Sequence, residues 1–455
     1  PTMMLRLLIV WTVLGSGCAA QSTPPSQHAS TDAPDLQAST LPCGFLATGV
    51  QKISLSRDAS HVNREPTAME SRMMRPLIRT ASRIRELSLK KSLTIRVQNQ
   101  AAIRYYLNSQ IKESDLKEAN AVYGSLGLLN DASELGALLL EVLSEQVVGY
   151  YDPEHHYLVV RDDVLSGLFK SDTAETGEAH AVLIHEIVHA LQDQHLSLGI
   201  LHKQERTSDA DGAFQSLVEG DATMAMLSYM GERVGVSLQQ FTQNVDALRA
   251  IMANAPMSNF PSEKLDNSPQ ILKSLLLSPY TDGLVFAASL YREGGWQALN
   301  AAYHNLPTTT SQILHPEQFL HSRNTPLHSL PSFPKKLPGN YTLVYTDSLG
   351  ELTWRVYASQ ALQEREAARL SHHWTADRIG VYQGPGGRLS AVWLGQWAHP
   401  SQAQNVGNVV AAIHEQSQPQ QCRPLNHVRN KGELIMVSHA IPEAAQHVLE
   451  RTLLQ

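Results

Sequence analysis

The feature that most constrains the fold of this chain is a predicted apolar helix. It contains two histidines and a glutamate. His185-Glu186-Ile187-Val188-His189 lies between Ala181–Ile184 and Ala190–Leu191, and these eleven positions contain neither Gly nor Pro. A helix this apolar is predicted to be buried. Burying two imidazoles and a carboxylate is costly unless a partner satisfies their polar atoms. The sequence therefore predicts a buried helix whose polar side chains share a ligand.

The spacing of the two histidines indicates that this ligand is a metal ion. Side chains four positions apart lie one helical turn above each other, so His185 and His189 can bind one ion. Glu186 then lies at the flank of the site, where it could hold a metal-bound water and accept its proton. This is the HExxH pattern of zinc-dependent peptidases. A surface helix with two unrelated histidines is the alternative interpretation.

Glu219 is the candidate for the third metal ligand, because a catalytic zinc site has three protein ligands and one position open to water. Ser208–Asp211 is typical of a helix start, and Glu219 lies within the apolar face of the helix that follows. Gly220 is small and would let this helix approach the first one closely. An ordinary exposed glutamate is the alternative. Asp221 is expected to hydrogen-bond a ligand histidine, or else to cap a neighbouring segment.

Together these motifs resemble the gluzincin group of zinc metallopeptidases, whose third ligand is a glutamate. More narrowly, residues 65–325, and more faintly the C-terminal region, resemble a set of largely uncharacterised bacterial secreted proteins. The shared motifs are Gly149–Pro153, His185–Gln194, Glu219–Ala222 and Ile313–Glu317. The resemblance implies a mainly helical, zincin-like metallopeptidase domain with a small sheet. Thermolysin-type enzymes carry an aspartate where this chain has Thr223, so the contact to a ligand histidine is expected from Asp221.

Two residues outside the metal helices are candidates for stabilising the oxyanion of a tetrahedral intermediate. Zinc peptidases commonly use a Tyr or a His for this purpose. Tyr280 lies at the start of a predicted helix, and His315 precedes a proline. Each residue could instead be only packed or capped.

Residues 146–160 predict a hairpin, because Tyr157–Val160 is rich in β-branched and aromatic residues and follows a strand and a turn. In peptidases of this type an edge strand beside the zinc helix pairs with the extended substrate. The hairpin is the candidate for this role, with two strands of a purely structural sheet as the alternative. Residues 71–91 predict a helix with a solvated basic face.

The N-terminus predicts export. A positive charge at Arg6 precedes the short apolar run Leu7–Leu14, which is typical of a secretory signal and too short to span a bilayer. Small residues then lead to Cys18, which resembles the lipidation site of bacterial lipoproteins. We expect a signal peptide over residues 1–18, a flexible tether over 19–60, and membrane attachment in the periplasm or at the cell surface. Ordinary signal cleavage near Ala19 or Ala20 is the alternative.

Two further cysteines, Cys43 and Cys422, make one disulfide possible in an exported protein. The 455 residues allow two domains or more. We expect the metallopeptidase domain over 61–324, a Pro-rich linker over 325–340, and a small α+β accessory domain over 341–455 that positions substrate or binds a partner. The net charge of −7 and the lack of a basic patch argue against a nucleic-acid partner.

These observations predict an α+β, lipid-anchored zinc peptidase that acts on a peptide or protein substrate. His185, His189 and Glu219 would bind Zn²⁺, and Glu186 would act as general base and then general acid. The same ligands fit a facial-triad iron enzyme, but Glu186 would then have no role. A peptidase fold that binds or assembles envelope proteins without turnover is the rival from another class. A structural metal is a third possibility, although no fourth protein ligand is evident.

Overall fold

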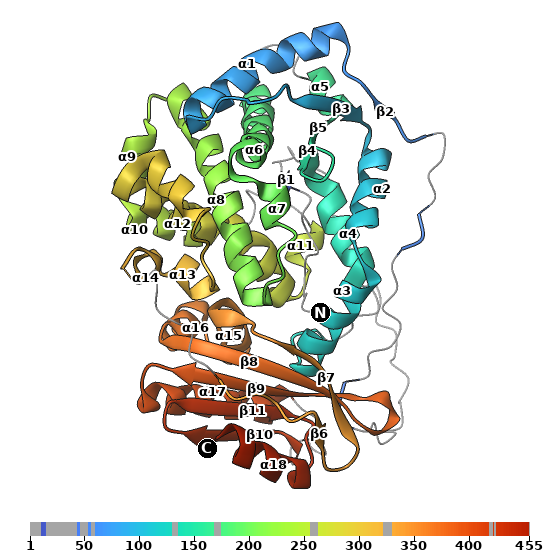
Figure 1. The fold of residues 1–455 in the computed structure, drawn as a ribbon, viewed down its shortest axis with the longest axis vertical. Coiled ribbons are helices and arrows are strands. Elements are labelled where there is room, and N and C mark those ends of the chain that lie inside the picture. The colour runs from blue at the N-terminus through green and yellow to red at the C-terminus, as the bar shows by residue number, and fades with distance from the viewer. Residues whose placement is uncertain are drawn as a thin grey trace, which may run out of the picture.

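The computed structural model describes residues 11–14, 43–45, 53–55, 60–129, 135–167, 174–254, 263–321, 330–417, 422 and 425–454. In these ranges the chain is a mixture of helices and two β-sheets, as the α+β prediction requires. Figure 1 shows a mainly helical body above a C-terminal sheet with its own helices.

The sheet of the helical body contains the predicted hairpin. Strands β4 (Val147–Asp152) and β5 (Tyr157–Arg161) are antiparallel, and Gly149 pairs with Val160. The sheet order is β1–β4–β5–β3–β2, in which β3 is parallel to β5. The three remaining strands are β1 (Trp11–Leu14), β2 (Asn63–Arg64) and β3 (Thr94–Gln98). Only β1 separates β4 from the edge of this sheet.

Two helices that are buried over most of their length form the centre of the body. Helix α6 (Ala174–Leu196) carries the HExxH motif, and α8 (Ser208–Arg233) begins one residue earlier than predicted, because Thr207 and not Ser208 is its N-cap. Helix α12 (Gln270–Ala302) packs along α8, with non-helical backbone at Gly294 and Gly295. A methyl group at Gly220 would overlap the carbonyl of Gly283, so Gly220 allows close approach to α12 and not, as predicted, to the HExxH helix α6.

The other helices of the body surround this centre and the sheet (Figure 1). They are α1 (Ala68–Arg85), α2 (Gln100–Gln110), α3 (Glu113–Ala119), the π-helical turn η1 (Asn120–Gly124), α4 (Leu135–Gln146), α5 (Asp162–Gly167), α7 (Leu198–Leu201), α9 (Leu238–Thr242), α10 (Val245–Asn254), α11 (Glu263–Asp266), α13 (Thr310–Leu314) and α14 (Pro316–His321). Helix α1 overlaps the basic helix predicted over 71–91 but begins at Ala68 and ends at Arg85, which is fully buried. The prediction that the basic face is solvated is therefore wrong at this position.

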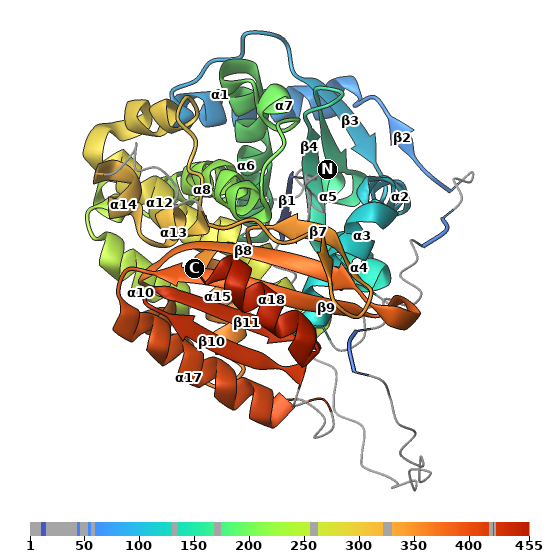
Figure 2. The same cartoon turned by 60° about the horizontal axis from the view of Figure 1, so that its bottom comes forward.

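The C-terminal part is an antiparallel sheet of order β10–β11–β9–β8–β7–β6. Its elements are β6 (Lys336–Leu337), β7 (Tyr341–Asp347), α15 (Gly350–Ala358), α16 (Glu364–Ser371), β8 (Trp374–Gln383), the 3₁₀ turn Pro385–Gly387, β9 (Leu389–Trp397), α17 (Pro400–Ser417), β10 (His427–Lys431), β11 (Leu434–His439) and α18 (Glu443–Leu453). Alternating residues of its strands pack against α15 and α17 on one face and against α18 on the other (Figure 2).

The C-terminal part packs directly against the helical body. One hydrophobic core joins Tyr123 and Leu126 of the helical body to Tyr345 and Trp354 of the C-terminal part. From residue 330 onward the predicted linker is packed, with Leu330 and Phe333 buried against the sheet. The predicted accessory domain is therefore fused to the body by a shared core.

The disulfide predicted between Cys43 and Cys422 is present, with 5.5 Å between the two Cα atoms. Cys18 and most of the predicted signal and tether lie outside the described residues. Among the residues that the structure describes, no helix is both long and apolar enough to cross a membrane.

Candidate metal centre

Three side chains from two helices converge at the centre of the body. His185 Nε2 lies 3.0 Å from Glu219 Oε2, and His189 Nε2 lies 3.6 Å from the same oxygen. Their candidate ligand atoms all lie within 4.8 Å of one another. Atoms about 2.0 Å from one tetrahedral ion are about 3.3 Å apart, so the spacing suits a single metal. The group predicted from the sequence can thus hold a metal ion.

The three side chains are buried, so their polar atoms need a bonding partner other than water. Both histidines are fully buried, and Glu219 is 6% exposed. Residues 181–191 of α6 are buried too, as the apolar sequence predicts. The alternatives of a surface helix and of an exposed glutamate are therefore wrong.

Gln192 fixes the orientation of one imidazole. Its amide nitrogen donates to the Val218 carbonyl of α8 (3.1 Å), so its oxygen faces His189 Nδ1 at 2.8 Å. An amide oxygen only accepts, so Nδ1 must donate to it, which leaves Nε2 as the ring nitrogen that faces Glu219. A hydrogen bond of this kind orients a histidine ligand and raises its basicity. Gln192 therefore performs the orienting role that the sequence interpretation gave to Asp221.

The charges of the group also suit a cation. Burial lowers the pKa of His185 to about 4, so this imidazole is neutral and its lone pair is available at neutral pH. Burial by itself would raise the pKa of Glu219, but the neighbouring His189 and His185 outweigh it and lower that pKa. The centre is thus two imidazoles and one carboxylate, a donor set that zinc accepts.

Glu186 lies between the metal helix and strand β4. Its Oε2 accepts a hydrogen bond of 3.0 Å from the Tyr151 backbone N–H. Glu186 is fully buried, and β4 packs against α6. One carboxylate oxygen is therefore held by the strand beside the metal group.

Asp221 does not bond a ligand histidine. Its carboxylate accepts from Arg85 Nε (2.6 Å) and Nη2 (3.0 Å) and from the Tyr303 hydroxyl (2.9 Å). The expectation of a histidine contact is wrong because Arg85, a full cation, satisfies both carboxylate oxygens. Arg85 also lies over the ring of Trp296, 4.4 Å from its centre. Asp221 therefore ties α8 to α1 behind the metal group.

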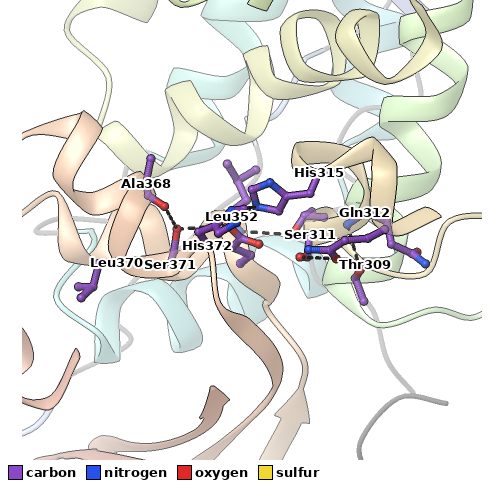
Figure 3. A network of polar contacts seen from close by, with 12 residues as sticks. Thr309, Ser311, Gln312, His315, Leu352, Ala368, Leu370, Ser371 and His372 are labelled. Atoms are coloured by element: carbon purple, nitrogen blue, oxygen red, sulfur yellow. Dashed lines mark hydrogen bonds and ion pairs between the residues drawn. The ribbon is translucent and has the colours of Figure 1, made fainter. Parts of the chain in front are cut away.

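Tyr280 is brought to the metal group, whereas His315 is not. The ring centre of Tyr280 lies 6.1 Å from that of His185, with the two planes 29° apart. His315 Nε2 instead bonds Glu351 Oε1 (2.8 Å), and its ring packs against His372 of the C-terminal part (4.2 Å). Figure 3 shows this network, in which His315 faces α15 and α16. Of the two oxyanion candidates, the structure thus places only Tyr280 at the centre.

Comparison of the chain with protein-family models, with curated proteins and with solved structures found no match. The assignment of the metal centre therefore depends on the geometry of its residues alone. Of the residues that sequence reasoning missed, Gln192 could have been found from its position three residues after His189 on the same helix. Arg85 could not, because it precedes Asp221 by 136 positions and no local pattern joins them.

Proposed function

We propose that this protein is a zinc-dependent peptidase of the gluzincin type. The observation that carries the proposal is the convergence of His185 Nε2, His189 Nε2 and Glu219 Oε2 beside a buried Glu186. Three protein donors leave a fourth tetrahedral position open, which is the arrangement of catalytic rather than structural zinc. An iron centre with the same donors would leave Glu186 without a role.

Different residues around the centre would carry out different steps of peptide hydrolysis. Zinc bound there would act as a Lewis acid toward the scissile carbonyl and lower the pKa of the attacking water. Glu186 would take the proton of that water and deliver it to the leaving amine. The hydrogen bond from Tyr151 N–H holds one oxygen of this carboxylate in place. Tyr280 is proposed to donate to the developing oxyanion.

Strand β4 is proposed to hold the extended substrate beside this centre. Its outer edge pairs antiparallel with β1, with Trp11 opposite Tyr151, so this edge can accept an added strand. Tyr151 also bonds Glu186, which joins the strand directly to the proposed base. Peptides added to a sheet edge bind through main-chain hydrogen bonds. If export removes residues 1–17, β1 leaves with them and the β4 edge becomes available.

We also propose where in the cell this protein acts. We propose that Cys18 is lipidated after export and that the enzyme acts in the bacterial envelope from a membrane anchor. The Cys43–Cys422 disulfide supports an oxidising compartment. Replacement of Cys18 by serine should abolish incorporation of labelled fatty acid and release the protein from the membrane fraction. Unchanged labelling would refute lipidation at Cys18.

Three purified proteins test the chemistry: wild type, Glu186→Gln and His189→Asn. We expect about one zinc per chain in wild type and Glu186→Gln by elemental analysis, and loss of zinc in His189→Asn. A peptide library should be cleaved only by wild type, with a loss of at least a thousandfold in Glu186→Gln. Glu154→Gln, which removes an exposed carboxylate, is the matched control and should cleave normally.

The alternative function predicts a different result in these experiments. A peptidase fold that only binds or assembles envelope proteins would bind zinc but would cleave no peptide, with or without Glu186. Equal cleavage by wild type and Glu186→Gln, or wild type without metal, would overturn the peptidase proposal.

A further inference from the structure

One tyrosine of strand β4 bonds two acidic residues of the HExxH helix. The Tyr151 backbone N–H donates to Glu186 Oε2 at 3.0 Å, and the Tyr151 hydroxyl donates to Asp193 Oδ2 at 2.8 Å. Glu186 and Asp193 are seven positions apart, which places them on one face of α6, two helical turns from each other. Tyr151 therefore ties β4 to the helix at two points.

The carboxylate of Asp193 is also held by two other segments. Its Oδ1 accepts from the Gly199 N–H of α7 at 3.0 Å, and its Oδ2 lies 2.7 Å from His156 Nδ1 in the turn between β4 and β5. The Asp193 side chain is 5% exposed, and Tyr151 is 1% exposed. Three contacts on a shielded carboxylate fix the point to which the tyrosine ring is attached.

The Tyr151 hydroxyl remains a hydrogen-bond donor at neutral pH. Burial raises the pKa of Tyr151, and the negative charge of Asp193 raises it further, so the phenol keeps its proton. A hydroxyl that donates to a carboxylate makes one of the stronger hydrogen bonds in proteins. Without this bond, the backbone bond to Glu186 would be the only hydrogen bond from Tyr151 to α6 among the described residues.

The two-point attachment bears on the position of the proposed base. A general base must lie within hydrogen-bonding reach of the proton that it accepts, and small displacements of a reacting group cost rate. Asp193 is not a member of the metal-ligating group, so its effect on the reaction would pass through Tyr151. Given the peptidase function on which this inference rests, we propose that Asp193 is a positioning residue that fixes Glu186 through Tyr151.

Tyr151→Phe tests this role, because it removes only the hydroxyl. We expect kcat for peptide cleavage to fall about 10–100-fold with KM and zinc affinity unchanged, since the base is displaced while the metal ligands stay in place. Tyr106→Phe is the matched control, because the Tyr106 hydroxyl of α2 donates to Asp152 Oδ2, also at 2.8 Å. The control should lose comparable stability and cleave normally. Unchanged kcat in Tyr151→Phe overturns the positioning role.

Variants of Asp193 test the same contact from its other side. Asp193→Asn keeps a hydrogen-bonding group toward Tyr151 and should retain most of kcat, whereas Asp193→Leu should lose as much as Tyr151→Phe. The two substitutions Asp193→Leu and Tyr151→Phe together should lower kcat no further, because both remove one bond. Additive losses overturn the role. If Asp193→Leu does not fold, Tyr151→Phe decides alone, since it leaves the contacts of Asp193 with Gly199 and His156 intact.

Hydrogen exchange at residue 151 separates this inference from the proposed function. The backbone N–H should exchange at least about tenfold faster in Tyr151→Phe than in wild type, because loss of the side-chain contact loosens its bond to Glu186. Tyr106→Phe should exchange there at the wild-type rate. An unchanged rate in Tyr151→Phe overturns the inference whether or not peptides are cleaved. A wild type that cleaves no peptide overturns the peptidase proposal, while the exchange rate still decides whether Asp193 holds residue 151.

Discussion

Arg85 and Asp221 form a fully buried, two-point ion pair that holds α1 against α8 two residues beyond the metal ligand Glu219. Arg85 Nε lies 2.6 Å from Oδ1 and Nη2 lies 3.0 Å from Oδ2, and Arg85 Nη2 also donates to Asn300 Oδ1 at 2.6 Å. Both side chains are wholly shielded from solvent. The pair, with Asn300, therefore connects α1, α8 and α12 near the metal centre.

Removing one partner of this pair should be far more damaging than removing both. Asp221→Leu leaves a buried guanidinium without its counter-ion, which we expect to lower the free energy of unfolding by about 3–5 kcal/mol. Arg85→Met combined with Asp221→Leu should recover much of that loss, because no buried charge remains. Urea unfolding of the two single variants and the double variant measures this. Additive losses in the double variant would contradict the coupling.

The close approach of α8 and α12 depends on Gly220. A methyl group there would overlap the backbone of Gly283, so Gly220→Ala should separate the two helices and lower stability by about 1–3 kcal/mol. Zinc affinity should fall with it, since Glu219 is the adjacent residue. Gly212→Ala is the matched control on the same helix, because its methyl would lie 3.4 Å from Thr310 Cγ2, an ordinary contact. That control should be neutral or stabilising by up to about 1 kcal/mol.

Gln192 should increase zinc affinity although it does not bind the metal itself. Gln192→Met removes the acceptor for His189 Nδ1–H, and we expect zinc affinity to fall about 10–100-fold while the fold is retained. Competition with a zinc chelator measures the change, and circular dichroism checks the fold. Gln194→Met, at a half-buried position of the same helix that bonds Lys90 and Lys91, should leave zinc affinity unchanged. Wild-type affinity in Gln192→Met would show that the orienting bond is unimportant.

The N-terminus of α1 predicts a pH dependence of stability. The hydrogen bonds from Arg64 lower the pKa of Glu70 to about 2, from an ordinary value of 4.5, and the Thr67 capping box assists. Because the folded pKa is the lower one, this contribution is fully present above about pH 4.5 and is lost as the pH falls toward 2.

Glu70→Gln should therefore lower stability by about 1 kcal/mol at pH 7, a value reduced for the partly exposed Arg64, with the difference vanishing near pH 2. Melting temperatures of both proteins between pH 2 and 7 measure this. Glu113→Gln, at an exposed pair with Lys117, should have a smaller effect. A constant difference across the whole pH range would exclude Glu70 as its source.

The sequence by itself determined the features that depend on local periodicity and residue chemistry. Helical spacing placed His185 and His189 on one face, and the apolar flanks required burial. The helix-start pattern at Ser208–Asp211 located the helix that carries Glu219 to within one residue. The two cysteines that remained after Cys18 identified the disulfide between Cys43 and Cys422. Each inference uses a physical rule that acts over a few residues or a choice among very few partners.

Only the tertiary structure decided the contacts between distant segments. It paired Asp221 with Arg85 instead of a histidine, and it separated His315 from the centre while bringing Tyr280 to it. It also joined the C-terminal part to the body through a shared core. Such contacts depend on how helices and sheets pack, and packing among segments a hundred or more residues apart follows from the shape of the whole core.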